Sequence, residues 1–261
     1  MTERTIRACL NTACPSLKFF DVIDSTNTYL KHAAAEGAIH GSVVVADAQT
    51  AGRGRMGRTF QSPGKKGLYL SVLLRPELSA EVLMKSTGMA AVAAVRAIER
   101  VSGAKAGIKW TNDLVLNGRK LCGILAETVM MGESVALIIG VGINVYHARG
   151  DFEGEVADLA TSLAAEGYYV ERPQLAAALI EELYCLSDRM GGEIEDYLQE
   201  YRRRCVTIGK DVRLLWTEGQ ERAFAEDIDD TFGLVVRRED GEILTVKTGE
   251  VSVRGLYGYV E

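Results

Sequence analysis

The stretch DAQTAGRGRMGRTFQSPGKKGLY, residues 47–69, is the part of the chain around which the rest is organised. It joins two apolar runs, 42–46 and 68–74, each of the length and composition of a buried strand. Between them lie five glycines and five basic residues but few apolar groups. Such a segment has little to bury, which predicts a mobile surface loop between two strands. Free glycine amides interleaved with arginines suit this loop to wrapping an anion.

Two other interpretations of the loop compete with this one. Residues 52–57, GRGRMG, match the dinucleotide-binding pattern G-x-G-x-x-G, which requires a helix to begin at its last glycine. The sequel RTFQSPG, residues 58–64, is incompatible with a helix because of its proline and glycine. The second alternative is a solvated or RNA-binding Arg-Gly segment. A net charge of −6 argues against nucleic acid as the main partner.

The composition is that of an ordinary globular protein, with 47% hydrophobic and 25% charged residues among 261. This length allows one large domain or a large and a small one. The chain shows neither an apolar run of transmembrane length nor a signal-peptide core at its start. Its five cysteines form no C-x-x-C pair, and His32, His40 and His147 lack metal-ligand spacing. Reduced thiols and a cytoplasmic location are therefore expected.

The remaining pattern mixes helices and strands. Ser25 or Thr26 is placed to cap a helix that follows a strand. An Asn117-Gly118 turn between apolar runs predicts a β-hairpin. The predicted strands are 17–22, 42–46, 68–74 and 134–145, and the predicted helices are 28–36, 80–101, 158–166, 173–190 and 193–204.

The hairpin has a testable register. With a two-residue turn, Val115 faces Lys120 and Asp113 faces Cys122, so that all four side chains share one face. Asp113 and Lys120 could then form a plain surface ion pair, which contributes little to stability. They could equally form a site for a metal ion and a phosphate.

The pattern changes near residues 205–209. Four short strands follow, at 211–216, 221–229, 233–238 and 242–247, with turns at regular intervals. This spacing predicts a small β-barrel as a second domain.

Five motifs then stand in order along the chain. They are DSTN at 24–27, QTAGRGRMGR at 49–58, KWTND at 109–113 with RKLCGIL at 119–125, GVGINV at 140–145 and GEVSVR at 249–254. Each is weak alone, but their order and spacing resemble the biotin protein ligases over residues 17–261. A related lipoate or octanoate ligase is the alternative.

The resemblance implies an α+β fold of the class II synthetase-like, biotin–lipoate ligase type. In such a fold a mixed or antiparallel β-sheet has helices packed on one side, and a small SH3-like β-barrel follows. The implied organisation is an N-terminal arm at 1–16, a catalytic domain at 17–207 and the barrel at 208–261.

The resemblance also implies a two-step reaction. Biotin and Mg-ATP give biotinyl-5′-AMP, and the biotin then passes to a lysine of a biotin carboxyl carrier domain of a carboxylase. Members that repress transcription carry an N-terminal DNA-binding domain, for which sixteen residues are too few, so no DNA partner is expected. No membrane partner is expected either, and a homodimer is compatible with the resemblance.

The site residues follow from the matching motif positions. The implied biotin-binding residues are Ser25, Thr26, Asn27, Gln49, Arg53, Gly54, Arg55, Lys120, Gly123 and Leu125. The implied ATP-binding residues are Arg55, Arg58, Phe60, Asn112, Lys120 and Asn144. Catalytic roles fall to Arg55, Lys120 and Asp113, with Asp113 also the expected Mg²⁺ ligand. Three positions depart from the family, which usually has proline at Thr111, often tryptophan at Phe60, and usually alanine or glycine at Cys122. Cys122 is expected to be a packing residue and not a catalytic one.

Overall fold

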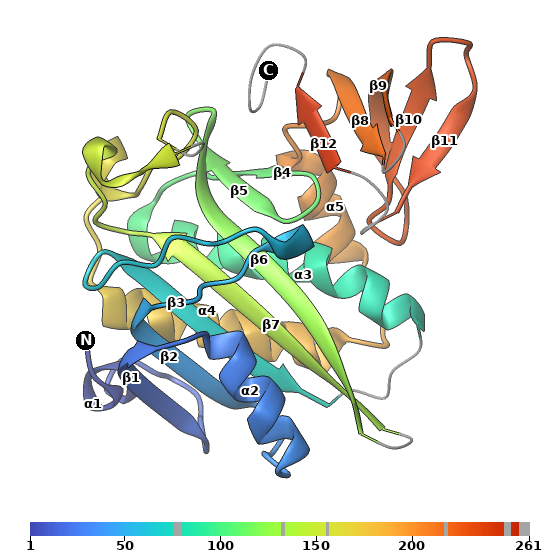
Figure 1. The fold of residues 1–261 in the computed structure, drawn as a ribbon. Helices are drawn as coiled ribbons and strands as arrows, with labels where there is room; N and C mark the ends of the chain where they lie inside the picture. The colour runs from blue at the N-terminus through green and yellow to red at the C-terminus, as the bar shows by residue number, and fades with distance from the viewer. Residues whose placement is uncertain (76–79, 132–133, 155–156, 217–218, 248–251, 256–261) are drawn as a thin grey trace.

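The computed structural model describes residues 1–75, 80–131, 134–154, 157–216, 219–247 and 252–255. Its largest element is a seven-stranded sheet in the order β1-β2-β3-β7-β6-β5-β4 (Figure 1). β1 and β2 are parallel and the other neighbours are antiparallel, so the sheet is mixed. The strands are β1 (Leu17–Ile23), β2 (Ser42–Gln49), β3 (Gly67–Leu74), β4 (Gly107–Lys109), β5 (Asp113–Leu116), β6 (Arg119–Met131) and β7 (Ser134–Asn144).

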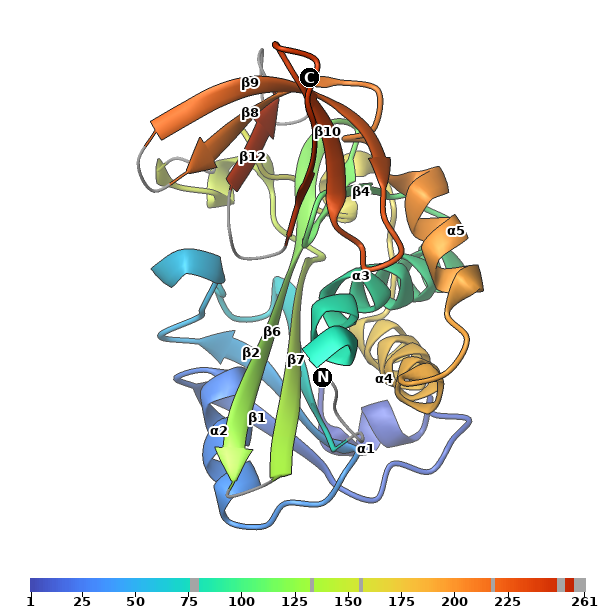
Figure 2. The ribbon, with the colours of Figure 1, turned by 90° about the vertical axis from the view of Figure 1, so that its right-hand side faces the viewer.

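Helices cover the two faces of this sheet unequally. The long helices α3 (Ala80–Ser102) and α4 (Arg172–Arg189) lie on one face, and α2 (Thr26–Ala35) lies on the other (Figure 2). Leu30 of α2 packs there against Leu73 of β3. Because β3 is covered from both sides, all of its eight residues are buried, which explains its continuous apolar sequence. None of the described helices combines the length and apolarity needed to cross a membrane.

A second, antiparallel sheet follows α5 (Glu195–Arg204). Its strands are β8 (Asp211–Trp216), β9 (Gly219–Ile228), β10 (Leu234–Arg238), β11 (Ile243–Val246) and β12 (Ser252–Gly255), in the order β11-β10-β9-β8-β12. Every second residue of β8, Val212 and Leu214, is buried, as expected for a sheet with one solvated face. Of the motif at 249–254, residues 249–251 lie outside the described residues.

The predicted α+β class is confirmed, with a large mixed sheet followed by a small antiparallel one. The N-terminal segment forms a short helix, α1 (Glu3–Arg7), which buries Ile6 in the main core. The helix predicted at 158–166 is wrong, since only its last three residues form a 3₁₀ turn. Instead, Lys120 donates its backbone N–H to Leu159 and accepts one from Thr161, at 2.7 and 2.8 Å. Backbone groups used in this bridge cannot form the i→i−4 bonds of a helix.

His147, just after β7, is a packing residue. It is 1% exposed, and its ring stacks on Phe152 with centroids 5.0 Å apart. Burial lowers the pKa of His147 to about 4, although the carboxylate of Asp151 acts in the opposite direction. The folded protein therefore keeps this imidazole neutral.

This burial predicts a pH-dependent loss of stability. As the pH falls below about 6.5, the unfolded chain binds a proton at His147, whereas the folded chain does not. The free energy of unfolding should therefore be about 2 kcal/mol lower at pH 5 than at pH 7.5. His147→Phe keeps the stacked ring and should remove this part of the loss. Chemical denaturation at pH 7.5 and pH 5 measures it, with the exposed His32→Gln as the control. Identical pH dependence in His147→Phe and the unmodified protein would contradict the prediction.

Candidate active site

The floor of the candidate site is a pair of strands from which side chains are missing. Gly123 of β6 lies opposite Gly142 of β7, and Gly140 precedes Gly142 by two residues in the same strand. A Cβ atom on Gly142 would lie 2.5 Å from the ring of Phe60, and one on Gly140 would lie 2.1 Å from Oδ1 of Asn27. Only glycine allows the two side chains to come this close to the sheet.

Polar side chains, here called the polar wall, lie at one end of this floor: Ser25, Thr26, Asn27, Gln49 and Ser71. Ser25 caps α2, and the next residue, Thr26, directs both its backbone N–H and its hydroxyl at Oε1 of Gln49, at 2.9 and 3.1 Å. Ser71 of β3 contacts the Thr26 hydroxyl at 2.7 Å and Oδ1 of Asn27 at 2.6 Å. Ser25, Thr26, Asn27 and Ser71 are buried and Gln49 is half-buried, and their hydrogen bonds make them a preorganised polar surface.

The sequence prediction missed Ser71. The one signal for it was a hydroxyl inside an otherwise apolar eight-residue strand, where a polar group needs a partner. Its contacts to Thr26 and Asn27 show which partners it found.

Glu127 is a second residue that the sequence prediction missed, and it ties the wall to the arginine-rich loop. Its carboxylate accepts a hydrogen bond from Nδ2 of Asn27 at 2.9 Å and pairs with both Lys31 and Arg53, the latter at 3.2 Å. Burial alone would raise the pKa of the Glu127 carboxyl, but the hydrogen bonds from Lys31 and Asn27 lower it overall. The sequence around Glu127 contains no motif that would have identified this role.

The loop itself is folded back across the floor. Gly54 donates to the carbonyl of Arg58 at 2.7 Å and Phe60 donates to that of Gly52 at 2.9 Å, with a 3₁₀ turn at Arg55–Gly57 between them. Arg58 after the turn is extended, so no α-helix begins here, in agreement with the rejection of a dinucleotide-binding loop. At its far end Ser62 accepts a hydrogen bond from Nε2 of Gln49 at 2.9 Å. Both ends of the loop are thus bonded to the polar wall.

Cations and one acid meet at the other end of the floor. Arg55 donates to Oδ1 of Asn112 at 3.1 Å, and Lys120 pairs with Asp113 at 2.6 Å. Burial lowers the pKa of Arg55, while Asp113 acts in the opposite direction. The Lys120 and Asp113 side chains are only 24% and 15% exposed, so this is not the solvated surface pair that the sequence also allowed. Two partly desolvated cations beside one carboxylate leave a net positive charge suited to an anion.

The predicted hairpin forms, but its register is partly wrong. Val115 faces Lys120 as expected, whereas Asp113 lies opposite Gly123 and not Cys122. A β-bulge at Leu121 adds one residue to β6, and both Leu121 and Cys122 are then buried in the main core. Cys122 is therefore a core residue on the opposite side from Lys120, and burial raises the pKa of its thiol.

The remaining predicted residues border the same region. Phe60 lies over Gly123 and Gly142, Leu125 accepts a bond from Asn27 through its carbonyl at 3.3 Å, and Asn144 donates to the carbonyl of Thr161 at 2.9 Å. Arg58 is exposed at the rim. The Trp110–Thr111 peptide bond before Asn112 is cis, at the position where the family usually has proline.

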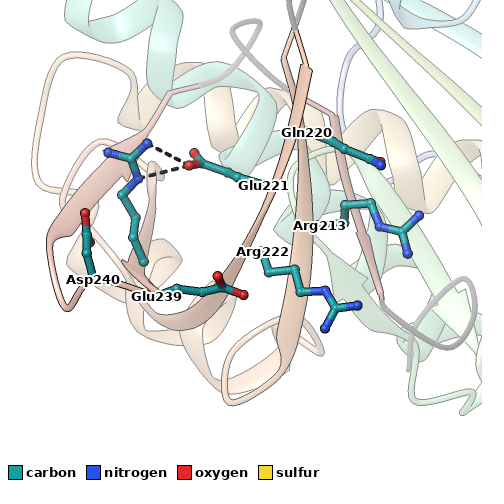
Figure 3. Close-up of a pocket in the computed structure, with 7 residues that line it drawn as sticks. Arg213, Gln220, Glu221, Arg222, Glu239 and Asp240 are labelled. Carbon is teal, nitrogen blue, oxygen red and sulfur yellow. Dashed lines mark hydrogen bonds and ion pairs between the residues drawn. The ribbon is translucent and has the colours of Figure 1, made fainter.

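A separate hollow of about 580 Å³ lies on the second sheet (Figure 3). Its lining balances three arginines (Arg213, Arg222, Arg238) against three acids (Glu221, Glu239, Asp240), together with Gln220. Arg238 and Glu221 pair at 2.6 Å within it. None of the predicted site residues lines this hollow, and its charges offset one another, so the candidate site is the glycine floor.

Comparison with known proteins agrees with the motifs. The profile of the Biotin/lipoate A/B protein ligase family matches residues 19–144. The chain is 35% identical to the bifunctional ligase/repressor BirA of Bacillus subtilis, over 92% of this chain and 76% of that protein. It is 34% identical to the biotin–[acetyl-CoA-carboxylase] ligase of Mycobacterium tuberculosis, over 96% of this chain and 95% of that one.

Solved structures with bound ligands have the same fold. The biotin protein ligase of Aquifex aeolicus in complex with biotin and ATP superposes with a TM-score of 0.77 at 26% identity, covering 92% of this chain and 99% of that one. The Leishmania major ligase in complex with biotinyl-5-AMP gives 0.64 at 26% identity, covering 90% and 99%. With the motifs, the fold and relatives matched over 76–99% of their length, this chain belongs to the biotin protein ligase family.

Proposed function

We propose that this chain activates biotin with Mg-ATP to biotinyl-5′-AMP and transfers the biotin to a lysine of a biotin carboxyl carrier domain. The observation that carries the proposal is the pairing, on one glycine floor, of a polar wall at one end with two desolvated cations at the other. A relative named as a biotin–[acetyl-CoA-carboxylase] ligase matches this chain at 34% identity, which favours biotin over lipoate or octanoate as the acid.

Biotin would lie along the floor between the two ends. Its ureido ring needs donors and acceptors together, which Ser25, Thr26 and Gln49 supply, with Asn27 behind them. Its apolar chain would follow Gly123 and Leu125, and Arg53 and Gly54 would close over it. Its carboxylate would then reach the cations Arg55 and Lys120.

ATP would occupy the region between the loop and the hairpin. Phe60 can stack on adenine and Asn144 borders the same part of the floor, while Arg58 and Asn112 lie toward the phosphates. The described residues hold no cluster of three or more His, Cys, Asp or Glu side chains that could bind a metal ion alone. Mg²⁺ commonly binds through one or two carboxylates and substrate phosphates, so the single acid Asp113 fits an ion that arrives with ATP.

The chemistry needs positive charge and not a protein nucleophile. A carboxylate oxygen of biotin attacks the α-phosphorus of ATP, and the bond to the bridging oxygen breaks to release pyrophosphate. Arg55 and Lys120 stabilise the negative charge that develops on the phosphate oxygens, and Mg²⁺ held by Asp113 would supply further positive charge. The neutral amine of the acceptor lysine then attacks the acyl carbon, loses a proton and expels AMP. Closure of the loop keeps water from the anhydride.

The partner and setting of the reaction follow from this proposal. The acceptor is a biotin carboxyl carrier domain of a carboxylase, and the expected location is the cytoplasm. A homodimer and the lack of DNA binding stay predictions.

The first test of the proposal is substrate-dependent activation. The protein should catalyse ATP–pyrophosphate exchange with biotin and Mg²⁺ together, because the adenylation step is reversible and needs both. Lipoate and octanoate, offered separately, should support little exchange. Exchange with lipoate or octanoate but not with biotin would contradict the assignment.

Lys120 should contribute directly to adenylation. Lys120→Ala removes a preorganised cation from the site and should cost roughly 2–4 kcal/mol of transition-state stabilisation. Single-turnover formation of biotinyl-AMP measures this loss, and the exposed Lys105→Ala is the matched control. A melting curve checks folding, since Asp113 loses its partner, and Lys120→Gln offers a milder second variant. Unchanged adenylation in folded Lys120→Ala would remove this residue from the site.

The loop should become protected when the substrates bind. Free protein should be cut by trypsin after Arg53, Arg55 or Arg58, and biotin with ATP should slow the cutting, because the bound adenylate contacts these arginines. Glu127→Gln removes the ion pair to Arg53 and should speed cutting of the free protein. Lys31→Gln removes the other cation on the same carboxylate and should not. Equal cutting with and without substrates would exclude a closing loop.

A further inference from the structure

Trp110 is a residue of the KWTND motif to which the proposed chemistry gives no role. It is 4% exposed, and its indole N–H donates to the backbone carbonyl of Phe232 at 2.9 Å. Phe232 lies in the turn between β9 and β10 of the second sheet. The backbone N–H of Trp110 also donates to the hydroxyl of Thr207 at 3.0 Å. Trp110, the first residue of the turn that joins β4 to β5, is therefore held by the C-terminal part of the chain.

Phe232 is itself held firmly. Its backbone has φ +64°, a left-handed conformation that is costly for a bulky residue and favours glycine. Asp229 stabilises this turn by accepting hydrogen bonds from the backbone N–H groups of Thr231 and Gly233, at 2.8 and 2.7 Å. A bulky residue in this conformation persists only where its surroundings compensate for the strain.

The compensation comes from the ring of Phe232. It is 1% exposed and fills a notch on α3 at Gly88, where a Cβ atom would lie 2.3 Å from the ring. It also meets Tyr201 of α5 edge-on, with centroids 5.2 Å apart. Figure 2 shows the second sheet seated over the end of α3 with α5 beside it. The ring and the carbonyl of one residue thus join the second sheet to both α3 and Trp110.

The same cluster reaches the proposed catalytic residues. The Tyr201 hydroxyl donates to the carbonyl of Thr111 at 3.2 Å. The next two residues are Asn112, which accepts from Arg55 at 3.1 Å, and Asp113, which pairs with Lys120 at 2.6 Å. The backbone directly before both residues is therefore fixed by Phe232 and Tyr201.

We infer that the second sheet is a working part of the adenylation site, and that Phe232 is a positioning residue which, through Trp110, sets the place of Asn112 and Asp113. The inference rests on the proposed function. The biotin wall lies at the opposite end of the floor and makes no use of this contact. Loosening it should therefore lower kcat for adenylation while leaving KM for biotin nearly unchanged.

Trp110→Phe tests the contact with a minimal change, because it removes the N–H donor and keeps an aromatic ring. We expect kcat for biotin-dependent pyrophosphate exchange to fall about tenfold or more, since small displacements of a catalytic group are costly. KM for biotin should stay within about twofold on the same reasoning. Because Asp113 is displaced, the Mg²⁺ concentration for half-maximal rate should rise. Tyr201→Phe, which loses only its hydroxyl, should show the same pattern more weakly.

Trp216→Phe is the matched control. Trp216, in β8, makes a bond of the same kind, from its indole N–H to Oε1 of Glu221 at 2.8 Å, but within the second sheet. This variant should keep both kcat and KM. If the unmodified protein shows no biotin-dependent exchange, the proposed function fails. If it is active and Trp110→Phe is equally active, the proposed function stands and the positioning role is wrong.

A second readout does not depend on activity. The chain has two tryptophans, so Trp216→Phe leaves Trp110 as its single tryptophan. Adding Phe232→Leu in this background should shift the Trp110 emission to longer wavelength while the melting curve stays cooperative, because the turn that covers the indole loses the ring that fixes it and the indole becomes more exposed to water. Unshifted emission with unchanged kcat in a folded Phe232→Leu protein would overturn the inference. Shifted emission together with a lower kcat would support it.

Discussion

The absence of side chains on two adjacent strands is the constraint on which the rest of the site depends. Gly123, Gly140 and Gly142 clear a strip in the middle of the sheet, and the side chains of Asn27 and Phe60 descend onto it to distances that any Cβ atom would forbid. Glycine lowers the stability of a strand interior, and here the flanking strands and the helices on both faces offset that cost. A flat ligand can lie on such a strip only because the sheet around it is otherwise densely packed.

Polar groups are distributed around this strip so that each is satisfied before any ligand arrives. Gln49 uses its amide oxygen for Thr26 and its amide nitrogen for Ser62, and Glu127 binds Asn27 and two cations. A ligand that enters the wall must exchange hydrogen bonds with this network and cannot simply add to it. Since the loop shares the same network, binding at the wall and closure of the loop are energetically linked.

Most of the fold, and the outline of the site, could be predicted from the sequence. The strand and helix patterns predicted most of the elements, the Asn117-Gly118 turn placed the hairpin, and residues of the first four motifs lie around one glycine floor. Three features escaped because they depend on neighbours distant in sequence. The segment at 158–166 forms backbone hydrogen bonds with Lys120 and not a helix. Ser71 and Glu127 acquire their roles only from partners on other elements. Phe232 has a backbone conformation that favours glycine. Tertiary contacts override local propensity at each of these places.

The bulge at Leu121 determines which face of β6 carries Lys120. Lys120 and Gly123 are three residues apart, and in a regular strand an odd separation would place them on opposite faces. The extra residue shifts the alternation of side chains by one position, so that Lys120 and Gly123 face the same side of the sheet. If the segment kept this residue but ran as a regular strand without the bulge, Lys120 and Gly123 would face opposite sides of the sheet, and one of the two would turn toward the core. The bulge is therefore a tighter constraint on this short segment than the identity of Leu121, for which another apolar residue would serve.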